Sequence, residues 1–72
     1  SRANLYSIYQ WHKFYKDQDK IVQQLVGQIP WGHNIVIMQK TKDVKAALWY
    51  IKKTIEHGWS RNVLIHQIEL NP

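Results

Sequence analysis

The sequence predicts an all-α fold of about five short helices. Three observations carry this prediction: apolar residues recur with a helical period, capping residues precede several of these segments, and Gly or Pro separates them. A chain of 72 residues allows one small domain with a modest core. We therefore assign residues 1–72 to a single helical domain with a helix-turn-helix-like bundle. Because it begins at Ser1 without an initiator Met and ends at Asn71-Pro72, we expect it to be a fragment of a larger helical domain.

The first helix is expected to run from about Arg2 to Lys16, with Ser1 as its N-cap. Trp11 and Phe14 fall outside its most apolar face. The histidine on that face is interpreted as a packed core residue rather than as a ligand. The residues expected to face the core share one side of the 3.6-residue period: Leu5, Ile8, Tyr9, His12 and Tyr15.

The second helix is expected between Lys20 and Val26, because the acidic break before it, residues 17–19, suits a helix N-terminus. Gly27 can end this helix. Pro30 prevents its continuation, since proline lacks a backbone N–H and disfavours helical geometry in the residue before it. The residues assigned inward are Ile21 and Leu25, with Val22 as a further candidate.

The third helix is expected from Trp31 or Gly32 to about Lys42. The apolar residues within 35–38 are too dense for one narrow helix face, so a strand is the alternative. We prefer the helix.

The fourth and fifth helices have the clearest boundaries. Asp43 is a good N-cap for the fourth helix and Gly58 supplies its C-terminal stop, whereas Ser60 caps a fifth helix that runs to about Leu70. The inward stripes are expected to be Val44, Ala47, Leu48, Ile51 and Ile55 in the fourth helix, and Val63, Leu64, Gln67 and Ile68 in the fifth.

Composition limits the classes of function. Ten Lys and Arg against five Asp and Glu give a net charge of +5, which favours an anionic partner such as DNA. The chain has no Cys, its carboxylates are scattered, and its four His lack metal-ligand spacing, so we expect no catalytic centre, metal or cofactor. No apolar run approaches the ~20 residues of a membrane span. We expect a cytoplasmic protein without a membrane partner.

Basic residues beside an outward aromatic residue form one candidate contact surface. On the fourth helix Lys45, Lys52 and Lys53 lie beside Trp49, which is directed away from the apolar stripe. These lysines could neutralise phosphates while the indole stacks or packs on a partner. The alternative is a solvated lysine face on which Trp49 is covered by a neighbouring helix or by another part of the parent protein.

Two helix starts form a second candidate. Arg2 follows Ser1 and Arg61 follows Ser60, so each Arg lies beside the free N–H groups of a first helical turn, where a DNA phosphate could bind. The alternative is that each Ser only caps its helix.

The corner before the third helix fits a helix-turn-helix motif. In such motifs the N-terminal residues of the second helix touch base edges in the major groove. On this interpretation Asn34 reads an adenine, His33 contacts bases or phosphates, and Lys40 and Lys42 extend along the backbone. The alternative is a structural elbow in which Trp31 fills the core and Asn34 caps a helix.

Several blocks of the sequence carry a resemblance to a known family. The blocks are Ser1-Arg2-x-Asn4-Leu5, Ile21 to Val26, Gln28-Ile29-Pro30-Trp31-Gly32-His33-Asn34, Leu48-Trp49-Tyr50 and Gly58-Trp59-Ser60-Arg61-Asn62-Val63-Leu64. Together they resemble the C-terminal portion of the N-terminal domain of bacterial YhcG-type proteins, of the PD-(D/E)XK nuclease superfamily. The resemblance implies a DNA-binding type of helical domain that precedes a nuclease domain, whose catalytic residues would lie downstream. It carries over eight residues as family motif positions: Trp31, Gly32, His33, Asn34, Trp59, Ser60, Arg61 and Asn62. We assign a structural role to Pro30, Trp31, Gly32, Gly58, Trp59 and Ser60.

The sequence therefore predicts a non-catalytic module that binds DNA and targets a parent nuclease. The alternative is a helical module for protein interaction or self-association, because several aromatic residues point outward and a homo-oligomer could cover them.

Overall fold

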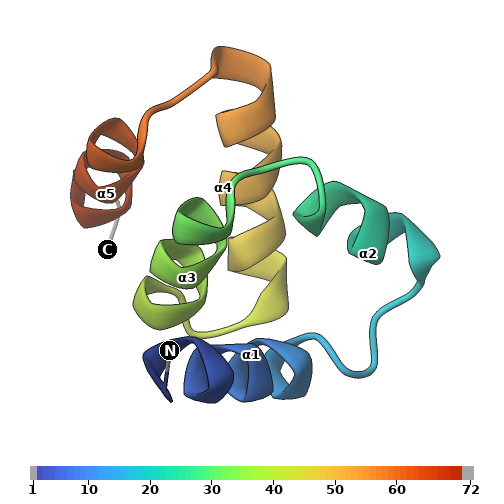
Figure 1. Cartoon of the computed structure of the whole chain (residues 1–72). Coiled ribbons are helices and arrows are strands. Elements are labelled where there is room, and N and C mark those ends of the chain that lie inside the picture. Colours follow the sequence, from blue (N-terminus) through green and yellow to red (C-terminus); the bar gives the residue numbers. More distant parts are fainter. Residues whose placement is uncertain (1, 71–72) are drawn as a thin grey trace.

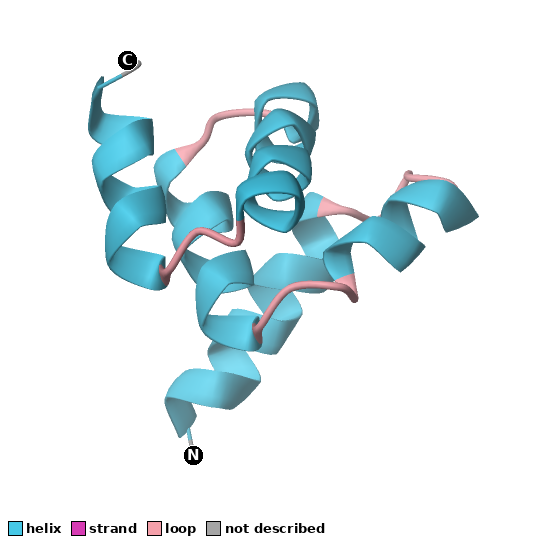
Figure 2. Ribbon diagram, turned by 90° about the horizontal axis from the view of Figure 1, so that it is seen from above, coloured by secondary structure: helices cyan, strands magenta, loops and turns pink. Residues whose placement is uncertain are grey.

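Five helices joined by short loops make up the fold (Figure 1). The computed structural model describes residues 2–70, with side chains from Leu5 onward. No strand occurs in this range (Figure 2), so the all-α prediction is confirmed and the strand alternative for 35–38 is wrong. Ser1, the expected N-cap, lies outside the described residues. The helices are α1 (Arg2–Phe14), α2 (Lys20–Val26), α3 (Trp31–Lys40), α4 (Val44–His57) and α5 (Arg61–Leu70).

Side-chain caps begin three of the helices. The carboxylate oxygens of Asp19 and Asp43 accept the backbone N–H three residues later, at 3.1 and 2.8 Å, and open α2 and α4. The Ser60 hydroxyl does the same for α5 at 3.2 Å. Each bond satisfies one of the N–H groups that a helix leaves free in its first turn. The predicted starts of these helices are confirmed.

The ends of α2 and α4 use glycine differently. Gly58 adopts the left-handed region, with φ 63° and ψ 38°, and its N–H donates to the carbonyl of Thr54 at 2.8 Å. Gly27 keeps a right-handed conformation with φ −75°, and the chain then turns through Pro30. Only Gly58 therefore needs the conformational freedom of glycine.

The core forms around α3, which packs against α1, α4 and α5 (Figure 1). α2 completes the fold by packing against α4. Four side chains from three helices are fully buried where these elements meet: Ile37, Ala47, Ile51 and Leu64. α3 thus has neighbours on several sides, which explains the dense apolar sequence of 35–38.

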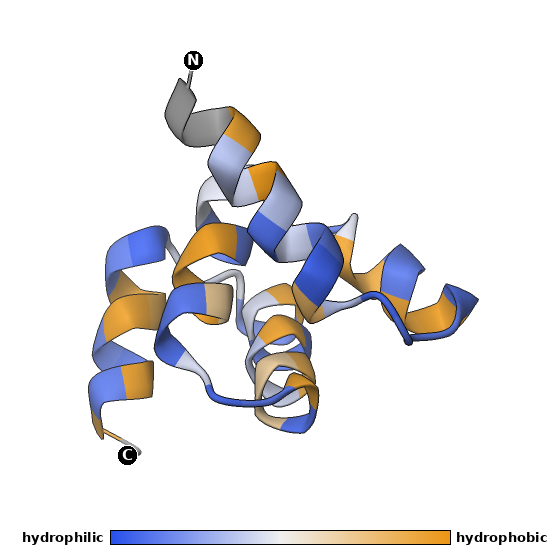
Figure 3. Cartoon of the chain, turned by 90° about the horizontal axis from the view of Figure 1, so that it is seen from below, coloured by the Kyte–Doolittle hydropathy of each residue, from blue (hydrophilic) through white to orange (hydrophobic). Residues whose placement is uncertain are grey.

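The inward face of α1 differs from the prediction. Tyr15 is 1% exposed as expected, but Leu5 is 72% exposed, and the other members of the predicted face, Ile8, Tyr9 and His12, also lie in solvent. Trp11 and Phe14 pack against the core instead. Rings at the C-terminal half of α1 bury more apolar area against α3 than the aliphatic residues at its other end can. Figure 3 shows apolar residues along the outer side of α1.

Smaller corrections apply to the other helices. α1 ends at Phe14 rather than Lys16, and α3 ends at Lys40 rather than Lys42. One residue of each predicted stripe in α2, α4 and α5 is exposed: Ile21, Ile55 and Val63. Val22, Tyr50 and Thr54 are buried, and Gln67 is half-buried.

Substituting the two helix-ending glycines tests this difference in backbone conformation. Gly58→Ala is expected to lower the free energy of unfolding by ~1 kcal/mol, because a Cβ at positive φ strains the backbone. No atom lies within 4 Å of the added Cβ, so the loss would be conformational rather than steric. Gly27→Ala is the matched control and should be neutral or stabilising. Urea denaturation measures both, and equal destabilisation would contradict the assignment.

Tyr15 predicts a dependence of stability on alkaline pH. Burial raises the pKa of its phenol to about 12, and the hydroxyl has no hydrogen-bond partner among the described residues. Between pH 10 and 12 the unfolded chain loses this proton while the folded chain keeps it, so stability falls as pH rises, by up to ~1.4 kcal/mol per unit.

The variant Tyr15→Phe removes both the titration and the unpaired hydroxyl. It should unfold at the same or higher urea concentration at neutral pH, and its stability should fall less between pH 10 and 12. Parallel decline of the two proteins over that range would show that another group is responsible.

Candidate nucleic-acid interface

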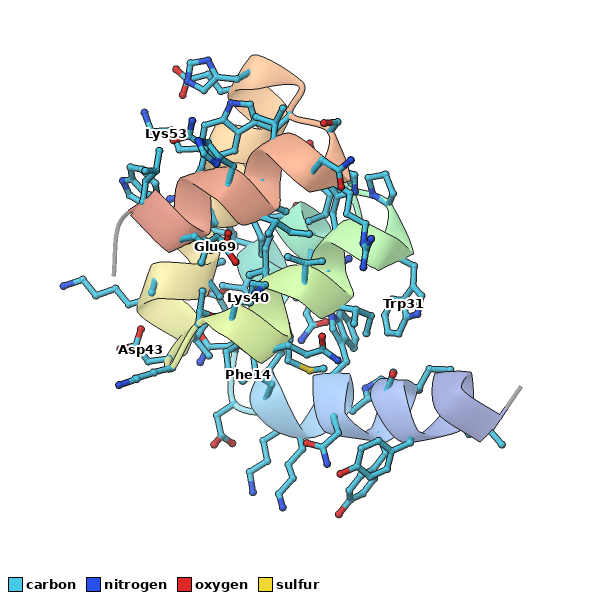
Figure 4. The ribbon with its side chains drawn as sticks, turned by 90° about the vertical axis from the view of Figure 1, so that its left-hand side faces the viewer. Phe14, Trp31, Lys40, Asp43, Lys53 and Glu69 are labelled. Carbon is cyan, nitrogen blue, oxygen red and sulfur yellow. The ribbon has the colours of Figure 1, made fainter. Side chains whose placement is uncertain are left out.

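The corner between α2 and α3 places its tryptophan at the edge of the core. Trp31 is 38% exposed, so its interpretation as a core plug is wrong. Its ring centre lies 5.9 Å from that of Trp11, and Figure 4 shows it standing out from α3 on the side of α1. Trp31 therefore links α3 to α1 through a half-open aromatic contact.

Asn34 points inward and holds the corner together. It is 4% exposed, and its side-chain amide donates to the carbonyl of Val26 at 2.8 Å. That carbonyl belongs to the last turn of α2, where helix carbonyls lack intrahelical partners. Asn34 thus caps the end of α2 from the first turn of α3. A side chain buried in this way has no access to a base edge, and we leave it out of the contact surface.

His33 and Gly32 join the corner to the loop between α4 and α5. The Nε2 atom of His33 lies 2.8 Å from the carbonyl oxygen of Trp59, so Nε2–H donates to it. A Cβ on Gly32 would meet the Cδ atom of Arg61 at 3.7 Å. The starts of α3 and α5 therefore lie side by side, and we call this arrangement the junction.

The junction brings together two sequence blocks that the family resemblance marked separately. The imidazole of His57 stacks on Trp59, with ring centres 5.5 Å apart and an angle of 19° between the planes. Residues from both blocks thus meet where α3 and α5 begin. Neither block alone carried a signal for this pairing, which depends on contacts between residues 26 positions apart.

The helix-turn-helix interpretation requires an accessible α3. Val36 and Ile37 are buried, Ile35 and Met38 are half-buried, and α1, α4 and α5 all pack against this helix. Entry of α3 into a major groove would require removal of these neighbours. The structure thus does not favour α3 as a recognition helix.

The outward side of α4 gathers basic residues around an aromatic ring. Trp49 is 48% exposed, and the Nζ atom of Lys53 lies 5.5 Å from the centre of its ring. Lys45 precedes Trp49 by one helical turn and Lys52 follows it by one turn, and both are exposed. Residues at these spacings are neighbours on a helix surface. We call Lys45, Trp49, Lys52 and Lys53 the α4 surface.

The charges of the α4 surface are largely uncompensated. Lys45 and Lys52 form no ion pair within the described part of the chain. Lys53 lies 3.4 Å from the carboxylate of Glu56, which also lies 3.5 Å from His57. An exposed ion pair of this kind is weak, so Lys53 can leave Glu56 and bind another anion at little cost in free energy.

The remaining basic candidates lie elsewhere. Lys40 pairs with Glu69 at 3.5 Å and so joins the ends of α3 and α5, as Figure 4 shows. Lys42 is exposed in the loop before α4, and Arg61 is exposed beside Gly32. The side chain of Arg2 lies outside the described residues. The structure therefore groups three of the predicted basic residues around Trp49 and leaves the others apart.

Two other kinds of site, a metal site and a membrane span, find no support in the described residues. No three His, Asp or Glu side chains in residues 2–70 come together as a metal site would require. None of the described helices is long and apolar enough to cross a membrane.

One family model matches the chain, that of the DUF1016 N-terminal domain, over residues 1–71. This match agrees with the resemblance to the YhcG-type N-terminal domain. No curated protein and no solved structure gives a significant match.

The structural role of Asn34 can be tested against its predicted role in base reading. Asn34→Ala removes the cap from a buried carbonyl and is expected to lower the free energy of unfolding by ~1–3 kcal/mol. Asn62→Ala, at an exposed position of α5, is the matched control and should change it by less than ~0.5 kcal/mol. Urea denaturation measures both. Unchanged stability in Asn34→Ala, combined with lost DNA binding, would restore Asn34 as a contact residue.

Proposed function

The chain belongs to the DUF1016 N-terminal domain family, and we propose that it binds duplex DNA through the α4 surface without catalysing a reaction itself. The observation that carries the proposal is the half-exposed ring of Trp49 among three lysines on one side of a helix. The net charge of +5 adds a long-range attraction for a polyanion.

The chemistry of the α4 surface suits phosphate better than a neutral partner. Each lysine that reaches a phosphate releases condensed counterions, and this release supplies most of the affinity of non-specific DNA binding. Lys45 and Lys52 form no ion pair among the described residues, so their binding to phosphate breaks none. Glu56 opposes this attraction at one end of the surface.

Readout of the base sequence is not part of the proposal. The amide of Asn34, the side chain best suited to an adenine, is committed to Val26 inside the fold. Lysines on a helix surface position a protein on the phosphate backbone and carry little sequence information. We propose a module that raises the local concentration of DNA for a partner domain.

The resemblance to YhcG-type proteins supplies that partner domain. A PD-(D/E)XK nuclease domain elsewhere in the parent protein would carry out the cleavage, and this helical domain would deliver it to DNA. Arg61 at the junction is a secondary candidate for a phosphate contact, because it is exposed beside the start of α3.

A second candidate function is protein interaction, which the outer side of α1 favours. Leu5, Tyr6 and Tyr9 are each more than half exposed there. Trp31 adds apolar surface beside Ile8. Exposed apolar residues gathered on one helix commonly mark a site where another protein binds, including a second copy of the same chain.

Fluorescence anisotropy with a labelled duplex, repeated over a series of salt concentrations, tests the DNA proposal. We expect binding at low salt that weakens as salt rises, with a log–log slope of about −2.7 if three lysines each neutralise one phosphate. Simultaneous substitution of Lys45, Lys52 and Lys53 by Gln should abolish most of this dependence. Glu56→Gln should strengthen binding, because it removes a negative charge that repels the phosphates.

The matched control replaces Lys13, Lys16 and Lys20 by Gln, three exposed lysines outside α4. It removes the same charge and should retain most of the affinity. Equal loss in both triple variants would show that net charge alone binds DNA, against the α4 surface. Sedimentation of the same samples at several concentrations examines the second candidate, since self-association without DNA affinity would favour protein interaction.

A further inference from the structure

The ring of Trp49 has an unusual setting for an exposed indole. It lies on the outward side of α4, with about half of its surface accessible. It meets the adjacent ring of Tyr50 in a T-shaped contact, with ring centres 4.9 Å apart and planes at 84°. The ammonium of Lys53 sits 5.5 Å from the ring centre. The ring is thus held at its position while part of it stays open to solvent.

An intact duplex offers this ring little to stack upon. Both faces of every internal base are covered by neighbouring base pairs, and separating a step costs a few kcal/mol. An unpaired base has an open face, and its stacking on an aromatic side chain is a main source of affinity for single strands. The Trp49 ring therefore gains more from DNA with unpaired bases than from a continuous duplex.

The lysines place such a base beside its own backbone. Lys45 and Lys52 lie one turn before and after Trp49, at a spacing of ~5–6 Å between adjacent Cβ atoms. A strand that follows α4 can therefore place phosphates at both lysines while one of its bases reaches the ring. Lys53, already at the ring, stays close enough to neutralise the phosphate of that base.

We propose that Trp49 stacks on an unpaired base and gives this domain a preference for DNA in which a duplex is interrupted by an unpaired segment. The proposal rests on the proposed function, because it assigns the ligand class to the same α4 surface. A protein partner for Trp49 would need apolar surface and acidic groups together. One strand of DNA supplies both a base that stacks on Trp49 and the negative charges of its phosphates.

The experiment compares two labelled DNAs of equal length and equal phosphate number, a fully paired duplex and the same duplex with a short mismatched bubble. The chain should bind the bubble more tightly. Trp49→Ala should weaken bubble binding roughly 5- to 150-fold, the loss expected for one stacked base, and should weaken duplex binding by a smaller factor. Trp49→Phe should retain part of the preference, because a smaller ring still stacks.

Trp31→Ala is the matched control, since it removes another partly exposed indole outside the α4 surface. It should keep the preference for the bubble. Circular dichroism melts establish that each variant is folded, and Trp49→Phe serves if Trp49→Ala is not.

Two different failures can be told apart. Equal affinity of the unsubstituted chain for both DNAs, or an equal loss for both in Trp49→Ala, would overturn the stacking proposal and leave DNA binding in place. Absence of salt-sensitive affinity for either DNA would overturn the proposed function, and the stacking proposal with it.

Discussion

The fold depends on how the first turn of α3 is held. Two hydrogen bonds fix it from opposite directions, one from Asn34 to the end of α2 and one from His33 to the carbonyl before α5. Pro30 brings the chain into this turn without an N–H of its own, so the chain cannot continue α2 and must change direction. Once α3 has this position, α1, α4 and α5 can all pack against it.

Burial of α3 decides which surfaces remain for a partner. A central helix uses its side chains for packing, and the polar groups near its start hold neighbouring segments together. α4 is different, because Ala47, Ile51 and Thr54 bury one side and leave the opposite side in solvent. The accessible ring of Trp49 on that side lies among lysines. In this domain the solvent-facing side of α4 is therefore a better contact surface than the helix after the turn.

The sequence allowed prediction of features that depend on neighbouring residues. Asp43, Gly58 and Ser60 mark helix ends because capping bonds form within a few residues, and the outward direction of Trp49 follows from the apolar stripe of its own helix. The inward face of α1 could not be predicted in this way. Leu5 and Trp11 are both apolar, and only the position of α3 decides which one is buried. The junction likewise joins segments far apart in the sequence.

The arrangement of charge supports a role in holding DNA rather than reading it. Lys40 is committed to Glu69, a pair that joins α3 to α5, whereas Lys45 and Lys52 carry no such commitment within the described chain. Surface lysines attract any phosphate backbone, so discrimination between DNAs must come from a group sensitive to the state of the bases. Trp49 is the side chain on the α4 surface with that property, because stacking requires an open base face. On the proposed function, selection would follow DNA structure rather than base sequence.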